Sequence, residues 1–276
     1  MQSPPVTELI TRTRAALRNW YWLAPLAWLA LPSRLPPHSG LLDTSLGRTS
    51  VRLQLRNGTT LVCRLNEIEG FFSAFVARDY APPGVHLREA RTVVDVGANV
   101  GAAALWFATE APNARIVALE PASETYPVLC ANVAANRLAR RVHPRQIALG
   151  GSNRTAFVEP GIYSLSTRVS SDARAGGRPV EQLSLDALME QEHITAIDVL
   201  KLDCEGAEYD ILLGASDAAL RQVRAIVGEH HAVNGHAPWQ IEERLRAAGF
   251  EVCIDDNPGL GMFSASRKWQ PAAVRC

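Results

Sequence analysis

The chain lacks the features that mark several large classes of protein. Its 276 residues carry 28 basic and 28 acidic side chains, so the formal net charge is zero. This balance gives no sign of the basic surface that nucleic-acid binding requires. Long apolar runs are also missing, because the most apolar stretch, residues 19–32, is interrupted by Pro25 and is too short to span a membrane. We therefore expect neither a nucleic-acid partner nor a transmembrane helix.

Cysteine is scarce and irregularly placed. None of the five cysteines belongs to a C-x-x-C motif or to another metal-binding spacing. An odd number of cysteines with long gaps between them argues against a disulfide framework. The sequence therefore predicts free thiols and a cytoplasmic protein.

Residues 1–90 are expected to form an extension that contains a helical segment and a β-hairpin. Its arginine-rich start and apolar run superficially resemble a signal peptide, but Glu8 interrupts the basic leader and no clear cleavage motif follows. We expect this segment to pack on the domain or on a partner subunit of a homo-oligomer. Contact with a membrane surface through Trp20, Trp22 and Trp28 is the less favoured alternative. Farther along, Asn57-Gly58 between alternating apolar residues predicts the hairpin.

From residue 91 to residue 276, short β-branched runs alternate with helical patterns. Because the expected strands are apolar on both faces, the pattern predicts an α/β domain with a parallel sheet covered by helices on both sides. Residues 180–191 and 207–222 are each expected to form one helix. A Ser/Gly/Arg-rich segment between Glu159 and Pro179 interrupts the rhythm and is expected to be either a lid or a surface loop.

A glycine turn follows the first strand of this domain in the stretch "VVDVGANVG", residues 93–101. Ligands of open parallel sheets bind at the carboxyl ends of the strands. Gly97 would let the backbone approach a ligand, and Gly101 would let the next helix pack closely. Asp95 is suited to accept a hydrogen bond from an ammonium group. Glu120 ends the next strand 19 positions after Gly101, close to the spacing at which an acid binds ribose hydroxyls.

The form of the turn favours one nucleotide cofactor over another. It has the pattern D-x-G-x-x-x-G and lacks the additional glycine that a dinucleotide pyrophosphate requires. S-adenosylmethionine carries an amine and a ribose but no phosphate, so it fits the turn better. An NAD(P)-dependent oxidoreductase on a Rossmann-like fold is the alternative, and a non-catalytic nucleotide-binding protein is a third possibility.

Several segments together resemble the FkbM family of S-adenosylmethionine-dependent O-methyltransferases. They occur in one order between about Thr92 and Arg267: "VVDVGANVGAAALWFA", "IVALEP", "ANVAANRL", "SLDAL", "IDVLKLDCEGAEYDILLG" and "AIVGEHH". The resemblance implies a class I methyltransferase fold, with a seven-stranded, mostly parallel sheet whose last hairpin is antiparallel. It also implies methyl transfer to a hydroxyl of a small-molecule, sugar, glycolipid or polyketide-type acceptor.

The expected cofactor site combines the glycine turn with the strand ends beside it. By analogy with such folds, residues 146–148 are expected to contact the edge of the adenine ring. The full set comprises Asp95, Gly97, Ala98, Asn99, Gly101, Glu120, Pro121, Gln146, Ile147, Ala148 and Asp203.

Four carboxylates crowd the stretch "VLKLDCEGAEYDIL", residues 199–212. Asp203 and Glu205 follow an expected strand, so they should face the crevice where cofactor and acceptor meet. Their alternative role is to cap the next helix or to pair with Lys201. Glu208 and Asp210 fall in the first helical turn, where the helix dipole favours negative charge by roughly 0.3–1 kcal/mol, so we assign them a structural role.

The next strand ends in a second polar cluster, in which Glu229 and His231 should project to one face because they are two residues apart. We hypothesise that His231 or Glu205 is the general base and that Glu229 orients the acceptor. One alternative is a Mg²⁺ or Mn²⁺ site built from Asp203, Glu205, Glu229 and His231. The other alternative is a solvated histidine pair at positions 230 and 231.

Overall fold

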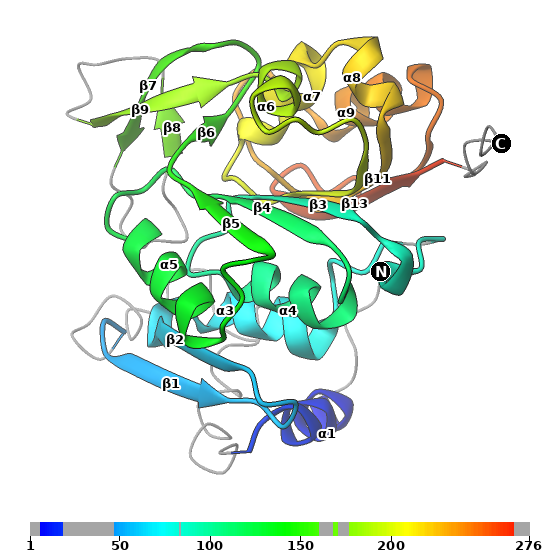
Figure 1. Cartoon of the computed structure of the whole chain (residues 1–276). Coiled ribbons are helices and arrows are strands. Elements are labelled where there is room, and N and C mark those ends of the chain that lie inside the picture. The colour runs from blue at the N-terminus through cyan, green and yellow to red at the C-terminus, as the bar shows by residue number, and fades with distance from the viewer. Residues whose placement is uncertain (1–5, 19–46, 83, 160–167, 171–176, 268–276) are drawn as a thin grey trace, which may run out of the picture.

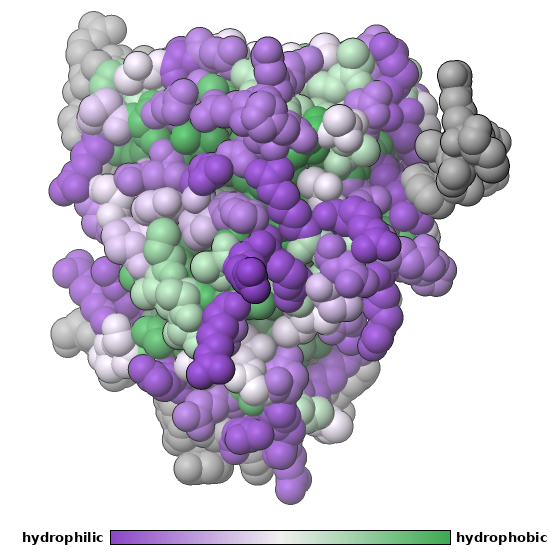
Figure 2. All heavy atoms as spheres, in the orientation of Figure 1, coloured by the Kyte–Doolittle hydropathy of each residue, from purple (hydrophilic) through white to green (hydrophobic). Residues whose placement is uncertain are grey.

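The structure is a computed structural model that describes residues 6–18, 47–82, 84–159, 168–170 and 177–267. Trp20, Trp22 and Trp28, for which a membrane contact is the less favoured alternative, lie outside the described residues. Within those residues, no helix is both long enough and apolar enough to cross a bilayer. The face of the molecule in Figure 2 is covered mainly by hydrophilic residues.

A seven-stranded sheet forms the centre of the molecule (Figure 1), in the order β12-β13-β11-β10-β3-β4-β5. The strands β11, β10, β3, β4 and β5 are parallel, and β13 is antiparallel to both of its neighbours. This arrangement confirms the predicted mostly parallel sheet with an antiparallel last hairpin. The strands span Thr92–Val96 (β3), Arg115–Leu119 (β4), Val142–Arg145 (β5), Ile197–Leu202 (β10), Val223–His231 (β11), Glu251–Ile254 (β12) and Leu260–Ser266 (β13).

Helices cover both faces of this sheet, as the sequence predicts (Figure 1). Two hydrophobic cores result, one on each side, because the strand side chains point alternately to the two faces. The helices on one side are Ala102–Glu110 (α4) and Tyr126–Ala135 (α5). The helices on the other side are Leu185–Gln191 (α6), Ala207–Gly214 (α7), Asp217–Arg221 (α8) and Pro238–Ala247 (α9).

Two expected helices are shorter in the structure than the sequence predicts. The single helix expected over residues 207–222 is divided into α7 and α8, because the Ser216 side chain accepts a hydrogen bond from the Ala219 amide and begins a new helix. The helix expected over residues 180–191 begins only after Ser184, whose side chain caps α6. The residues before it form strand β9, Arg178–Leu183.

A second, four-stranded sheet is inserted between β5 and α6, in the order β6-β9-β7-β8. Its other strands are Ala148–Leu149 (β6), Arg154–Glu159 (β7) and Arg168–Ser170 (β8). The segment between Glu159 and Pro179 therefore contains a strand, β8, that pairs with β7. Residues 160–167 and 171–176 of that segment lie outside the described residues, so the choice between lid and loop stays a prediction.

The described elements before residue 90 pack against one another and against α4 and α5 (Figure 1). The expected hairpin is confirmed, since Ser50–Gln54 (β1) and Thr60–Arg64 (β2) pair around the Asn57-Gly58 turn. Its core is continuous with Leu105 of α4. The remaining elements are Val6–Ala16 (α1), Leu65–Glu67 (η2), Ile68–Phe71 (α3), Phe72–Ala77 (η3) and Leu87–Glu89 (η4).

Two asparagines of α5 bind the hairpin to the rest of the fold. The Asn132 side chain accepts from the Val62 amide at 2.9 Å and donates to the Val62 carbonyl at 2.8 Å. Asn136 makes the same pair of bonds with Thr60. Asn132 and Asn136 are four residues apart on one helix face, and their partners Thr60 and Val62 are two residues apart on one strand edge. The two side-chain amides therefore make the hydrogen bonds that a neighbouring strand would make at the open edge of β2.

Replacement of Asn132 by alanine should destabilise the protein strongly. Asn132 is 1% exposed and also donates to the Val100 carbonyl, so its loss leaves buried backbone groups unpaired. We expect a loss of about 2–4 kcal/mol in the free energy of unfolding, measured by urea denaturation. Asn113→Ala removes an exposed amide and should cost less than about 0.5 kcal/mol. Equal effects of the two replacements would contradict this role of Asn132.

Candidate active site

A cavity of about 850 Å³, including its open mouth, lies at the carboxyl ends of β3, β4 and β10. This is the edge of the sheet at which the sequence places the cofactor. Eight of the predicted cofactor residues line it, namely Gly97, Ala98, Asn99, Glu120, Pro121, Ile147, Ala148 and Asp203. Glu205 also lines the cavity, together with residues outside the predicted set that include Glu67, Tyr80, Val169 and Lys201.

The glycine turn is shaped by the neighbouring loop. A Cβ atom at Gly97 would lie 1.8 Å from the backbone oxygen of Asp203, and its φ of +71° also favours glycine. Gly97 therefore allows the loop after β10 to approach, in addition to the expected approach of a ligand. Gly101 has the predicted packing role, because a Cβ there would lie 2.7 Å from the Leu129 side chain.

Glu120 holds the turn in place from the end of β4. One carboxylate oxygen accepts from the Asn99 amide at 2.9 Å and the other accepts from the Ala122 amide at 2.8 Å. Glu120 is only 6% exposed. Burial raises its pKa to about 7, although the hydrogen bonds from the two backbone amides lower that pKa. The carboxylate is thus fixed at the cavity wall, with lone pairs that a ligand hydroxyl can still use.

A buried ion pair lies beneath the turn. Lys201 of β10 stands opposite Asp95 of β3 in the ladder, with its Nζ 3.1 Å from Asp95 Oδ1 and 3.6 Å from Asp203 Oδ2. The same Nζ donates to the Val96 and Gly97 carbonyls. Burial alone would lower the pKa of Lys201, but Asp95 and Asp203 outweigh it and raise that pKa.

This pair corrects the role expected for Asp95. Asp95 is fully buried and is not among the described residues that line the cavity. Its carboxylate therefore neutralises Lys201 instead of facing the amine of a ligand. Gln146 also lies outside the cavity lining, but unlike Asp95 it is exposed, whereas its neighbours Ile147 and Ala148 contribute to the lining.

Tyr80 is a site residue that sequence reasoning missed. Its hydroxyl donates to Asp203 Oδ2 at 2.8 Å, and the side chain is 3% exposed. Burial and the charge of Asp203 raise its pKa, so the hydroxyl keeps its proton. Tyr80 lies in the segment before residue 90, where no motif marked a functional residue.

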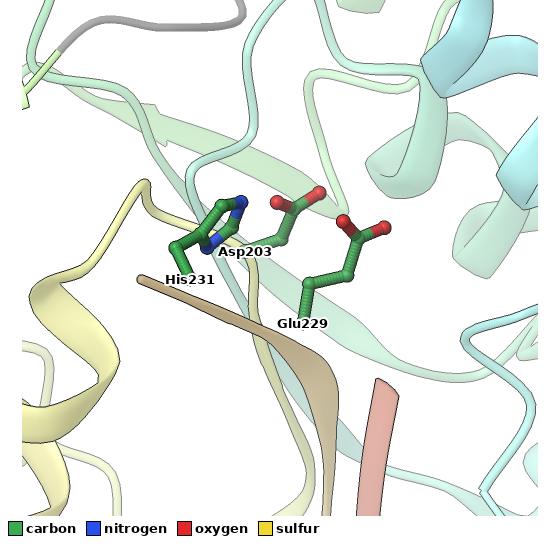
Figure 3. Close-up of side chains that lie close together, drawn as sticks. All are labelled: Asp203, Glu229 and His231. Atoms are coloured by element: carbon green, nitrogen blue, oxygen red, sulfur yellow. The ribbon is translucent and has the colours of Figure 1, made fainter. Parts of the chain in front are cut away.

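The second polar cluster comes together as predicted. Asp203, Glu229 and His231 each offer one atom that could bind a metal ion, and these atoms all lie within 4.8 Å of one another. Figure 3 shows Glu229 and His231 on one side of β11, facing Asp203. His231 Nδ1 lies 3.1 Å from Oε1 of Glu208, and its Nε2 lies 3.9 Å from Oε1 of Glu205. Asp203 therefore belongs both to the cavity wall and to this cluster.

Glu208 does more than the helix-start role that we assigned to it. Its side chain is fully buried and accepts from the Cys204 and Gly206 amides, both at 2.8 Å. The same carboxylate fixes the orientation of His231. Asp210 is exposed, as expected for a residue of the first helical turn.

The environment of His231 differs from the one expected for a general base. Burial would lower its pKa, but the hydrogen bond to Glu208 and the charges of Glu208, Glu205 and Asp203 raise it to about 9. A histidine with this pKa is protonated at neutral pH and cannot accept a proton there. Burial and Asp203 also raise the pKa of Glu229 well above its ordinary value. His230 is buried and its Nε2 lies 2.7 Å from the Asp255 carbonyl oxygen, so the two histidines are not a solvated pair.

The sheet order, the glycine turn and the acidic strand end together define a class I methyltransferase fold. The family model described as the methyltransferase FkbM domain matches residues 95–252, which is more than half of the chain. The chain belongs to this family and is a methyltransferase, which confirms the resemblance seen in the sequence.

Curated relatives agree with this assignment. The chain is 30% identical to 31-O-demethyl-FK506 methyltransferase FkbM of Streptomyces tacrolimicus, over 81% of this chain and 96% of that protein. It is 33% identical to the AMB antimetabolite synthetase AmbE of Pseudomonas aeruginosa, over 69% of this chain but only 11% of that longer protein. It is also 30% identical to the hexuronic acid methyltransferase AglP of Haloferax volcanii, over 56% of this chain and 61% of that protein.

Removal of the Lys201 charge should destabilise the fold. Lys201→Met leaves Asp95 buried without its counter-charge, so we expect a loss of about 3–5 kcal/mol in the free energy of unfolding, measured by urea denaturation. The double replacement Lys201→Met with Asp95→Asn removes the unpaired charge and should recover part of that loss. If the double variant is no more stable than Lys201→Met alone, the ion pair is not the cause.

Glu120 should make stability depend on pH between about 4.5 and 7. The folded protein keeps a proton on Glu120 in this range, whereas the unfolded chain releases it. The free energy of unfolding should therefore fall as the pH rises from 4.5 to 7, by about 3 kcal/mol for this group. The difference between wild type and Glu120→Gln, followed by urea denaturation across this range, isolates the effect. A pH-independent difference would contradict it.

Proposed function

We propose that this methyltransferase transfers the methyl group of S-adenosylmethionine to a hydroxyl group of an organic acceptor. The charge of the cavity is the observation that carries the proposal. Four acidic side chains line the cavity, from Glu67, Glu120, Asp203 and Glu205, and Glu120 adds its full charge above its raised pKa of about 7. Lys201 also lines it, but its single positive charge is shared between Asp95 and Asp203. Such a wall attracts a cationic ligand and disfavours a pyrophosphate.

The residues of the cavity fit the parts of this cofactor. Glu120 is placed to accept hydrogen bonds from ribose hydroxyls, and Ile147 and Ala148 offer apolar contact for the adenine ring. Within the described part of the chain, the buried Oδ1 atom of Asn99 has no hydrogen-bond partner, so it can accept from the amine. When bound, the cofactor supplies an electrophilic methyl group on a positively charged sulfur.

The remaining groups suit an oxygen acceptor. Much of the rate of an in-line displacement comes from aligning the donor with the acceptor. Asp203, held by Tyr80 and Lys201, borders both the cavity and the Glu229–His231 cluster. The raised pKa of His231 leaves Glu205 as the better of our two candidates for the base, and Glu205 lines the cavity. The name of the FkbM relative specifies an O-methyl product, which supports a hydroxyl acceptor here.

The class of acceptor is proposed from the relatives. The names of two of them specify FK506 lacking its 31-O-methyl group and hexuronic acid as their substrates. We therefore propose a hydroxyl-rich small molecule, sugar, glycolipid or polyketide-type acceptor for this protein. An NAD(P)-dependent oxidoreductase, the alternative from the sequence, is disfavoured by the four carboxylates of the cavity.

Binding of S-adenosylmethionine and S-adenosylhomocysteine should stabilise the protein, whereas NAD and NADP should not. At a concentration of about 100 times the dissociation constant, a ligand adds about 2.7 kcal/mol to the free energy of unfolding. A thermal shift assay with the four ligands measures this. A shift with NAD or NADP alone would reject the proposed cofactor.

At pH 8, where Glu120 is ionised, Glu120→Gln should weaken the binding of S-adenosylmethionine by about tenfold or more, since a hydrogen bond to a charged group contributes about 1.5–3 kcal/mol. Glu124→Gln removes an exposed carboxylate from the same loop and should leave the affinity unchanged. Isothermal titration calorimetry gives both values, and equal affinities in the two variants would contradict the role of Glu120.

A further inference from the structure

We propose that Asp203, Glu229 and His231 bind a divalent metal ion of the Mg²⁺ or Mn²⁺ type at the edge of the cofactor cavity. The three side chains come from the ends of two adjacent strands and face a common point (Figure 3). The ion's role in methyl transfer rests on the function proposed above, whereas its binding does not.

The spacing of the three residues suits a single ion. Their ligand atoms lie within 4.8 Å of one another. Two ligands bound to one Mg²⁺ at about 2.1 Å are at most about 4.2 Å apart. Adjacent ligands of such an octahedral ion are only about 3.0 Å apart, so side-chain rotations must bring at least two of the three separations to about 3 Å to complete the site. One imidazole nitrogen with two carboxylates is a donor set that Mn²⁺ accepts.

The orientation of His231 is a separate observation that points to a metal ion. Glu208, which is not one of the three ligands, lies 3.1 Å from His231 Nδ1. Two backbone amides hold Glu208 itself in place. When an ion displaces the Nε2 proton, His231 donates its Nδ1 hydrogen to this carboxylate, and the lone pair of Nε2 is directed away from Glu208. Metal-binding histidines are held by a carboxylate in this way.

Three protein ligands leave positions on the ion for oxygens of the acceptor. A hydroxyl bound there loses its proton more readily. In the proposed step, the acceptor O–H bond breaks and its proton passes to Glu205. The O–CH₃ bond forms as the S–CH₃ bond breaks, which leaves a neutral thioether. The metal ion keeps its charge and its protein ligands throughout.

Titration of the full-length, EDTA-treated protein with Mn²⁺, followed by electron paramagnetic resonance, tests the site. We expect one Mn²⁺ per chain with a dissociation constant below about 1 mM. Glu229→Gln should weaken binding by at least about tenfold, and Glu208→Gln should also weaken it, through the orientation of His231. Asp210→Asn removes an exposed carboxylate nearby and should leave binding unchanged.

Calorimetry with S-adenosylmethionine on the same samples separates this inference from the proposed function. Cofactor binding by Glu229→Gln would show that this variant is folded. Wild-type protein that binds the cofactor but no Mn²⁺ below about 1 mM would overturn the metal site alone. Mn²⁺ binding that Glu229→Gln and Asp210→Asn weaken equally would also overturn it. Mn²⁺ binding without cofactor binding would support the metal site and reject the proposed cofactor.

Discussion

The position of Lys201 determines how the two central strand ends meet. Its ammonium group sits between Asp95 and Asp203 and also donates to two carbonyls of the glycine turn. One buried cation thus fixes both the turn after β3 and the acidic tip of β10. Because a buried charge is tolerated only when its partners are well placed, the requirement to neutralise Lys201 also keeps the cavity walls in register.

The segment before residue 90 takes part in the site even though it lies outside the family match. Its hairpin is held by Asn132 and Asn136, and its later residues pack on α4. The same segment provides Tyr80, which binds Asp203. The extension is thus attached to the rest of the fold by the two asparagines at its hairpin, and it supplies Tyr80 to the site at the end of the parallel sheet.

Much of the fold could be predicted from local patterns. The alternation of apolar strands with helices predicted the sheet, and the glycine turn with Glu120 predicted one wall of the cavity. Both features depend on residues that are close in sequence or regularly spaced. The roles of Asp95, Tyr80 and Glu208 could not be predicted, because each depends on a partner from a distant segment. The pKa of His231 shows the same limit, since it is set by three carboxylates that only the folded chain places around the ring.

The proposed cofactor would interact differently with the carboxylates of the cavity before and after methyl transfer. In the proposed reaction, sulfur is positively charged before methyl transfer and uncharged afterwards. The negative wall therefore attracts the fresh donor more strongly than the spent one, by an amount that depends on the local dielectric. Exchange of the by-product for new donor is thus favoured by charge, and dissolved salt weakens this preference to the extent that ions reach the open mouth.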